Sequence, residues 1–127
     1  MRQIKVTPDE RRMLQERFNA KPSYILEVLR YGKNGPTAER IRRSALEMGG
    51  RYVDPDFSPN CRTSYIGGMI IQSFGERVRL EICRESGNIT LLKNGEVVEH
   101  QENASMDIWN SMAIKASSIA EAAMVSR

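Results

Sequence analysis

The sequence predicts an α+β fold, with three N-terminal helices, then a three- or four-stranded antiparallel meander, and a C-terminal helix that covers the meander. Three observations indicate this order. Apolar residues recur at helical spacing before residue 50. Between about residues 69 and 100 they alternate with polar residues, as half-buried strands require. After residue 105 they return to helical spacing.

The first predicted helix begins with the sequence TPDE, a capping box in which Thr7 and Glu10 each bond the other's backbone N–H. Pro8 suits the first helical position, where a missing N–H leaves no bond unmade. We expect the helix to end near Phe18, because Asn19 is well suited to a turn that requires positive φ. The residues expected to point inward are Met13, Leu14 and Phe18.

A second helix is predicted to start at Pro22, directly after that turn. Ile25, Val28 and Leu29 follow at spacings of three and four residues, which places them on one apolar face. The opposite face is polar. This pattern predicts a short helix that buries one side and leaves the other open.

The sequence YGKNGP at residues 31–36 is typical of a turn, and a third helix follows it. We expect this helix to run from about Asn34 or Thr37 to Met48, since two glycines come next. Ile41 and Ala45 belong to its inward face. Residues 1–50 are therefore predicted to form one helical domain.

Charge is unevenly distributed along the chain. Residues 1–50 contain 11 Lys and Arg against 6 Asp and Glu, whereas residues 51–127 contain 8 against 10. A basic first half suits a module that faces nucleic acid, joined to a second half that does not. A solvated surface with uneven charge is the alternative.

The second half is predicted to begin with an irregular connector and continue as a small domain. Residues 51–68 contain two prolines and little periodicity, which predicts the connector. Antiparallel strands are expected at about 69–74, 77–84, 88–93 and 96–100. Asn94-Gly95 between two of them indicates a two-residue hairpin turn.

The last helix, from about residue 105 to 125, carries one broad apolar stripe. Its members are Trp109, Met112, Ala113, Ala116, Ile119, Ala120 and Ala123. A meander needs such a cover to be stable by itself. Residues 69–127 are therefore expected to form a domain for oligomerisation or for contact with a partner.

A family resemblance adds to this interpretation. The segment LQERFNAKPSYILEVLR (residues 14–30) resembles the helix-turn-helix of phage repressors and of the lac-repressor headpiece, and NGPTAERIRRSALEMGG (34–50) is similar to the third helix of that headpiece. The resemblance covers residues 7–50. Where the family prefers a small residue, a glycine, and a Ser or Thr cap, this chain has Gln15, Asn19 and Lys21. It implies that the second helix lies in the major groove of DNA, with the first helix behind it.

The resemblance also implies which residues contact DNA. Those expected to face the groove are Lys21, Pro22, Ser23, Leu26, Glu27 and Arg30. Those expected to contact the DNA backbone are Lys33, Arg40, Arg42 and Arg43. Lys21 and Arg30 suit phosphate or a guanine edge, and Ser23 suits phosphate or a base. Leu26 suits a thymine methyl group, and Glu27 suits the amino group of cytosine.

Each of these interpretations has a structural alternative. Glu27 can pair with Arg30 or Lys21 along the helix, which contributes a few tenths of a kcal/mol. Leu26 can belong to the core or to an interface. The arginines between residues 40 and 43 can form a solvated helix face.

No motif of catalysis, metal binding or cofactor binding stands out in the sequence. His100 is the only histidine, and it follows a predicted strand among acidic residues. Cys61 and Cys83 lack the close spacing of metal ligands and the density of a disulfide scaffold. Glu81 and Asp107 are not spaced as a catalytic pair. We therefore expect no enzymatic activity, no metal and no cofactor.

The sequence as a whole predicts a sequence-specific double-stranded DNA-binding protein, a transcriptional regulator that acts as a dimer. A dimer is expected because one helix-turn-helix makes few contacts, so that useful affinity normally requires two copies on two half-sites. No membrane segment or secretory signal is visible, so a cytoplasmic, nucleoid-associated location is expected. The alternative is a protein-interaction module whose helical first half only packs. The sequence leaves a small-molecule ligand open.

Overall fold

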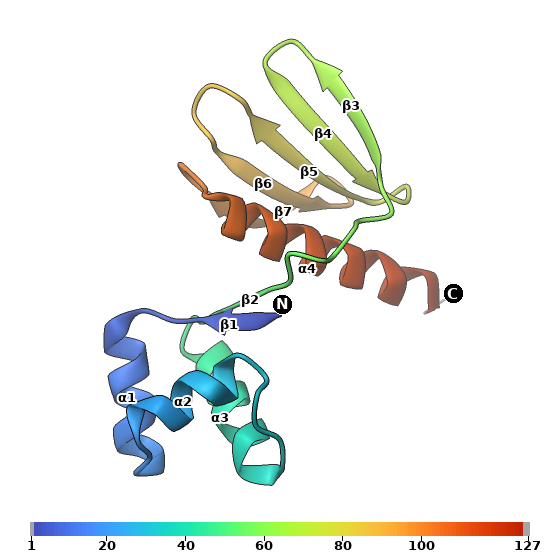
Figure 1. Cartoon of the computed structure of the whole chain (residues 1–127). Helices are drawn as coiled ribbons and strands as arrows, with labels where there is room; N and C mark the ends of the chain where they lie inside the picture. Colours follow the sequence, from blue (N-terminus) through green and yellow to red (C-terminus); the bar gives the residue numbers. More distant parts are fainter. Residues whose placement is uncertain (1, 126–127) are drawn as a thin grey trace. The chain divides into compact units, whose positions relative to one another are not determined.

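The computed structural model describes residues 2–125, with side chains up to residue 122 (Figure 1). Ala123, which the sequence pattern placed in the last apolar stripe, has its side chain outside the described residues, as do residues 126–127 as a whole. The chain divides into two compact units, residues 1–56 (unit 1) and 57–127 (unit 2). The predicted α+β class is confirmed, because the described residues form helices and two antiparallel sheets.

Unit 1 consists of three helices and a two-stranded ribbon. The helices are α1 (Pro8–Phe18), α2 (Pro22–Leu29) and α3 (Pro36–Glu47). The ribbon pairs β1 (Gln3–Lys5) with β2 (Arg51–Val53) in antiparallel orientation. Each helix packs on the other two, and α2 and α3 also pack on β1.

Local sequence sets where these helices begin. Each of the three starts with a proline at its first position. The predicted capping box is confirmed, since the Glu10 N–H donates to Thr7 Oγ1 (3.1 Å) and the Thr7 N–H donates to Glu10 Oε1 (2.8 Å). Lys21 precedes α2 without a side-chain capping bond. The start of α2 therefore depends on Pro22 and on packing.

The three helices end in the same way, with a residue in the left-handed conformation. These residues are Asn19, Tyr31 and Gly49, with φ of 48°, 63° and 107°. In each case the following N–H donates to a carbonyl five residues back, at 2.8–3.1 Å, which is the first bond of a Schellman motif. Asn and Gly tolerate this conformation, whereas Tyr adopts it at a cost.

The core of unit 1 is apolar throughout. Its buried residues are Ile4, Leu14, Ile25, Val28, Leu29, Ala38, Ile41 and Ala45. The inward faces predicted for the second and third helices are confirmed. Met13, also predicted to point inward, is 51% exposed, so that prediction is wrong. Leu14 fills the core from α1, and Phe18 packs against its edge.

The ribbon corrects the prediction that residues 51–68 form an irregular connector. Residues 51–53 pair with residues 3–5, and Ile4 and Val53 are both buried. Strands of three residues are too short to show a period of two in sequence. Their pairing also joins segments far apart in the chain, which local pattern does not reveal.

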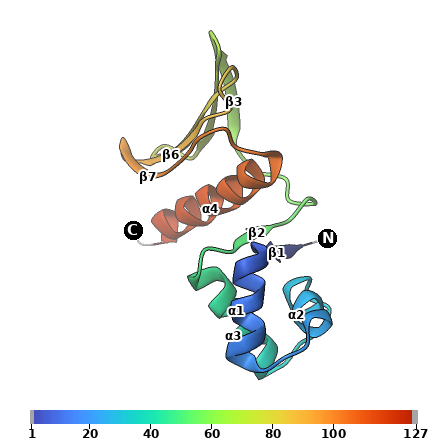
Figure 2. The ribbon, with the colours of Figure 1, turned by 90° about the vertical axis from the view of Figure 1, so that its left-hand side faces the viewer.

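Unit 2 is a five-stranded antiparallel meander with one helix. Its strands follow one another in space as they do in sequence: β3 (Arg62–Ile66), β4 (Met69–Phe74), β5 (Val78–Cys83), β6 (Ile89–Lys93) and β7 (Glu96–Gln101). The helix α4 (Met106–Val125) lies across one face of this sheet (Figures 1 and 2). The four predicted strands are confirmed as β4–β7. β3 lies in the segment predicted to be a connector, which is a second correction.

The core of unit 2 lies between the sheet and α4. Strands β4, β5 and β6 supply its larger residues, Phe74, Val78, Leu80, Ile82, Ile89 and Leu91. Met112, Ala113 and Ala116 meet them from α4, and all three are buried as the stripe predicted. Trp109 packs at the margin and donates its Nε1–H to Gln72 Oε1 at 3.0 Å. The small alanine side chains let the helix lie close to the strands.

We expect Gly50→Ala to destabilise unit 1 by about 1–3 kcal/mol, because the added methyl group would overlap the backbone of α3. A Cβ at Gly50 would lie 2.6 Å from the Ala45 carbonyl oxygen, which already accepts the Gly50 N–H. Native-state hydrogen exchange of the amides in α1–α3 measures the effect in unit 1.

Gly68→Ala is the matched control, since a Cβ there has no atom within 4 Å and Gly68 has no positive φ. We expect it to change the free energy of unfolding of unit 2 by no more than about 0.5 kcal/mol, as measured by hydrogen exchange of the amides in β4–β6. Equal effects of the two substitutions would contradict the assigned close approach.

Candidate nucleic-acid interface

The helix α2 has two faces of opposite character. Ile25, Val28 and Leu29 are buried against the rest of unit 1. The residues of the expected groove-facing set that are exposed are Lys21, Pro22, Ser23, Glu27 and Arg30. Leu26 is half-buried at the border between the two faces. The helix is thus held by its apolar side while its polar side remains open.

The turn that aims α2 takes three residues, from 19 to 21. Asn19 reverses the chain in the left-handed conformation, and Ala20 donates its N–H to the Gln15 carbonyl at 3.1 Å. Gln15 is half-buried, so its side chain is accommodated beside the α1–α2 crossing. The chain therefore makes a tight turn with Asn where a Gly is more common.

The other end of α2 is fixed by Tyr31. Its ring lies against the guanidinium groups of Arg2 and Arg42, at 4.3 and 4.6 Å from the ring centroid, and meets Tyr52 edge-on at 6.1 Å. Burial raises the pKa of Tyr31 and the neighbouring Tyr52 adds to the rise, while Arg42 and Arg2 oppose it. These contacts offset the cost, about 1–3 kcal/mol, of a left-handed tyrosine.

Arg42 belongs to this structural cluster. Its Nη1 donates to the Val28 carbonyl at 3.1 Å and to the Lys33 carbonyl at 2.9 Å, and the residue is half-buried. One guanidinium group therefore joins the end of α2 to the loop that follows. Arg42, which was expected to contact the DNA backbone, thus has a structural role within unit 1.

The other basic residues expected at the DNA backbone lie on the surface. Arg40 and Arg43 are exposed on α3. Lys33 is exposed in the α2–α3 loop, where its Nζ lies 3.7 Å from Glu27 Oε2. Glu27 is thus paired with Lys33, and not with Arg30 or Lys21 as the structural alternative supposed. Arg17, which the sequence did not single out, is exposed at the end of α1 and reaches Ser44 Oγ at 3.4 Å.

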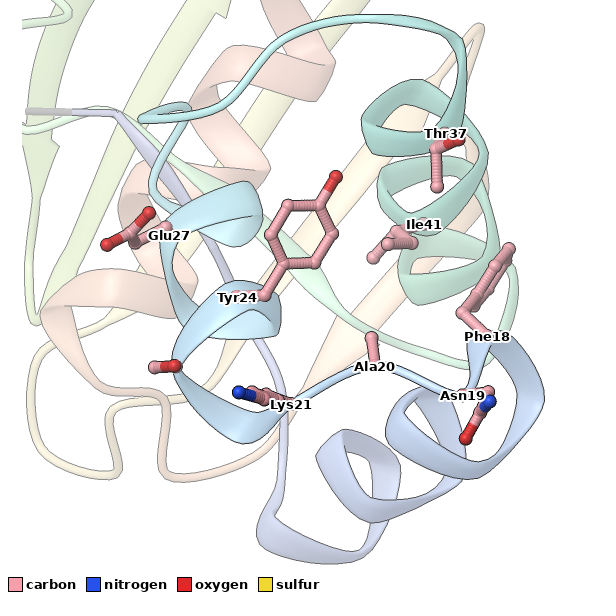
Figure 3. Close-up of a pocket in the computed structure, with 9 residues that line it drawn as sticks. Phe18, Asn19, Ala20, Lys21, Tyr24, Glu27, Thr37 and Ile41 are labelled. Atoms are coloured by element: carbon pink, nitrogen blue, oxygen red, sulfur yellow. The ribbon is translucent and has the colours of Figure 1, made fainter.

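An open hollow of about 510 Å³ lies beside the exposed face of α2 (Figure 3). The residues that line it are Phe18, Asn19, Ala20, Lys21, Ser23, Tyr24, Glu27, Thr37 and Ile41. Phe18, Tyr24 and Ile41 give it apolar walls, and Lys21 lies near its rim. Three of its members (Lys21, Ser23 and Glu27) were predicted to contact DNA.

The other six lining residues were not predicted to belong to a site, and Tyr24 and Thr37 are the two of them that carry a hydroxyl group. Tyr24 sits beside the apolar stripe of α2, where helical periodicity does not distinguish a core residue from a wall of the hollow. Thr37 lies in the first turn of α3, and its position opposite α2 depends on the loop between the helices. Neither position has a local sequence signal.

Within residues 2–125, no group of three His, Cys, Asp or Glu side chains is placed to hold a metal ion. None of the described helices is long and apolar enough to cross a membrane. The hollow offers hydroxyl groups, an amine and apolar walls, which are the groups that contact sugar, phosphate and base edges.

His100 and the two cysteines belong to unit 2. His100 Nδ1 lies 2.8 Å from Thr90 Oγ1, a cross-strand pair between β7 and β6. Cys61 and Cys83 are free thiols. Hydrogen bonds from the Ser86 side chain and then from the backbone after Cys83 lower the pKa of the Cys83 thiol.

We expect Arg42→Ala to lower the free energy of unfolding of unit 1 by about 1–3 kcal/mol, because two carbonyls lose a charged donor and Tyr31 loses a cation. Urea unfolding followed residue by residue with two-dimensional NMR measures this loss. Arg43→Ala, one residue away and exposed, is the control, and we expect a change below about 0.5 kcal/mol. Equal stability of the two variants would refute the structural role of Arg42.

The chain gave no match in comparison with known proteins. No protein-family model matches it, and no curated protein or solved structure is significantly similar to it. The likeness of residues 7–50 to helix-turn-helix domains therefore rests on the residue pattern, and function has to be inferred from the geometry of the candidate interface.

Proposed function

We propose that unit 1 is a helix-turn-helix DNA-binding domain, that α2 is its recognition helix, and that the protein is a sequence-specific transcriptional regulator. The observation that carries this proposal is the two-sided character of α2. Its apolar side is buried in the core of unit 1, and its polar side is exposed next to a hollow. A helix that reads the major groove needs both properties.

The exposed residues of α2 divide into two roles in this proposal. Ser23 and Arg30 read base edges, because both are exposed on the open face. Glu27 contributes to the choice of base only after exchanging its ion pair with Lys33, so its contribution is smaller. Leu26, at the border of the face, contacts a thymine methyl group with its exposed part.

The DNA backbone is contacted on both sides of α2. Arg40 and Arg43 supply exposed positive charge from α3, and Lys21 supplies it at the start of α2. The hollow accommodates a sugar–phosphate segment, with apolar walls for the sugar. Thr37 offers a hydroxyl group in the first turn of α3, where helical N–H groups have no partner within the helix.

The rival function is a protein-interaction module in which unit 1 only packs. One observation favours it: unit 2 exposes apolar side chains, among them Tyr65, Ile66 and Val97. The two functions are compatible, since a regulator needs a means of bringing two copies to two half-sites. Retention on DNA at low salt separates them, because a pure interaction module would not bind.

We expect the double variant Arg40→Ala/Arg43→Ala to bind all duplexes more weakly, because these residues contact backbone and not bases. The slope of log K against log salt concentration should fall in magnitude by about 1.8, since each lost phosphate contact removes about 0.9. Fluorescence anisotropy with labelled duplexes at several salt concentrations measures it. Arg77→Ala/Arg84→Ala, with the same charge removed from exposed positions in unit 2, should leave the slope unchanged.

We expect Arg30→Ala and Ser23→Ala to change sequence preference instead. Selection of bound duplexes from a random pool should show that each variant loses discrimination at about one base position, worth about 1–3 kcal/mol. Binding that is insensitive to salt, or no retention of any duplex by the unsubstituted protein, would overturn the proposed function.

A further inference from the structure

The outer edge of β3 is open. β3 pairs with β4 on one side, and none of the described strands pairs with its other side. All five of its residues are exposed, and Tyr65 and Ile66 are 70% and 64% exposed. An open edge with large apolar side chains is a template for pairing with another strand.

The opposite edge of the same sheet is protected. β7 carries the charged or titratable residues Glu96, Glu99 and His100, and the β6–β7 register shifts between Leu91 and Leu92. Charges and bulges are the usual means by which proteins prevent edge pairing. β3 has an unbroken register with β4 and a single charge, at Arg62. The sheet thus has one edge that discourages pairing and one that permits it.

The hairpin formed by β3 and β4 determines which backbone N–H and C=O groups of β3 point away from β4. Ile66 and Met69 are paired across a two-residue turn, which makes them a hydrogen-bonded pair. On the other side of β4, the Arg84 N–H donates to the Gly68 carbonyl (2.9 Å). This bond gives the β4–β5 pairs an alternation that agrees with that of the β3–β4 pairs. Because hydrogen-bonded and non-bonded pairs alternate, Thr63 and Tyr65 direct their N–H and C=O groups outward.

We propose that β3 pairs with β3 of a second copy of this chain, antiparallel, about a two-fold axis at Ser64. In this register Thr63 lies opposite the partner's Tyr65, and the two exchange backbone hydrogen bonds on each side of the axis. Ser64 lies opposite the partner's Ser64 in a non-hydrogen-bonded pair. The two meanders then form one continuous ten-stranded sheet.

A second copy suits this edge because the strand is complementary to itself. Arg62 falls opposite the partner's Ile66, so the only charges on the edge are not opposed to each other. Tyr65 falls opposite Thr63, a pairing of an aromatic with a β-branched residue. An axis at Thr63 or at Tyr65 would leave two residues of each strand unpaired. Pairing of β3 with the partner's β7 would build an open filament, against the acidic residues and bulge of β7.

Ser64→Cys tests the register. Residues that face each other in a non-hydrogen-bonded antiparallel pair have Cα atoms about 4.5 Å apart, within the range of a disulfide. We expect a disulfide-linked dimer on mild oxidation, at least about tenfold more abundant than with Thr63→Cys, whose copies are offset from the axis. Both variants also carry Cys61→Ser, because Cys61 Sγ lies 3.9 Å from Thr63 Oγ1 and would otherwise trap the thiol of the control. Equal cross-linking at the two positions would overturn the register.

Thr63→Pro tests the edge itself, because it removes an outward N–H and leaves the bonds to β4 in place. Sedimentation equilibrium should show a dimer for the unsubstituted chain and a monomer for this variant, with circular dichroism confirming that the variant is folded. Tyr65→Ser should weaken the dimer about tenfold, and Val97→Ser on β7 should not. The comparison of Tyr65→Ser with Val97→Ser still tests the edge if the proline variant does not fold.

Three results would overturn the proposal: a monomer at all concentrations, a dimer unaffected by changes in β3, or oligomers that grow with concentration, as β3–β7 pairing predicts. Capture of a different strand by a monomeric chain would show that a foreign partner occupies this edge. None of these experiments contains DNA. Their failure is therefore distinct from failure of the DNA-binding function, on which this proposal does not depend.

Discussion

Unit 1 depends above all on the cluster around Tyr31. Arg2 beside β1, Arg42 on α3 and Tyr52 on β2 all contact this one ring, and Arg42 also binds carbonyls at the end of α2 and in the next loop. The cluster joins the end of α2 and the loop after it to α3 and to the ribbon. The hollow lies between α2 and α3, and the turn at Asn19 supplies part of its lining.

The parts of the fold that sequence predicted are those with a local chemical cause. The capping box at Thr7, the apolar stripe of α2 and the alternation along β5 each arise from neighbouring residues, so each was visible. The missed strands lack a buried apolar pattern of their own. β2 exists because residues 3–5 pair with it, and β3 because β4 does, although all its own residues are exposed. An edge strand without a buried face has no hydrophobic pattern to detect.

The candidate interface shows the same limit. Exposure of Ser23, Arg30, Arg40 and Arg43 followed from helical periodicity, since each lies away from an apolar stripe. The structural role of Arg42 could not be predicted in this way. Its position in α3 does not reveal the carbonyl groups in the preceding helix and loop to which it donates. The walls of the hollow were missed for a similar reason. Tyr24 and Thr37 line the same hollow although they belong to different helices, α2 and α3.

The ribbon of β1 and β2 brings the two ends of unit 1 together, with Gln3 directly opposite Val53. A domain whose N- and C-termini are adjacent can be circularly permuted. A short linker then joins the two termini, and new termini are made in an exposed loop without altering the core. The loop between α2 and α3 is exposed at Asn34-Gly35, so new termini can be placed there. The order of the helices along the chain is therefore separable from their arrangement in space, and the same property makes this unit suitable for insertion into the surface loop of an unrelated protein.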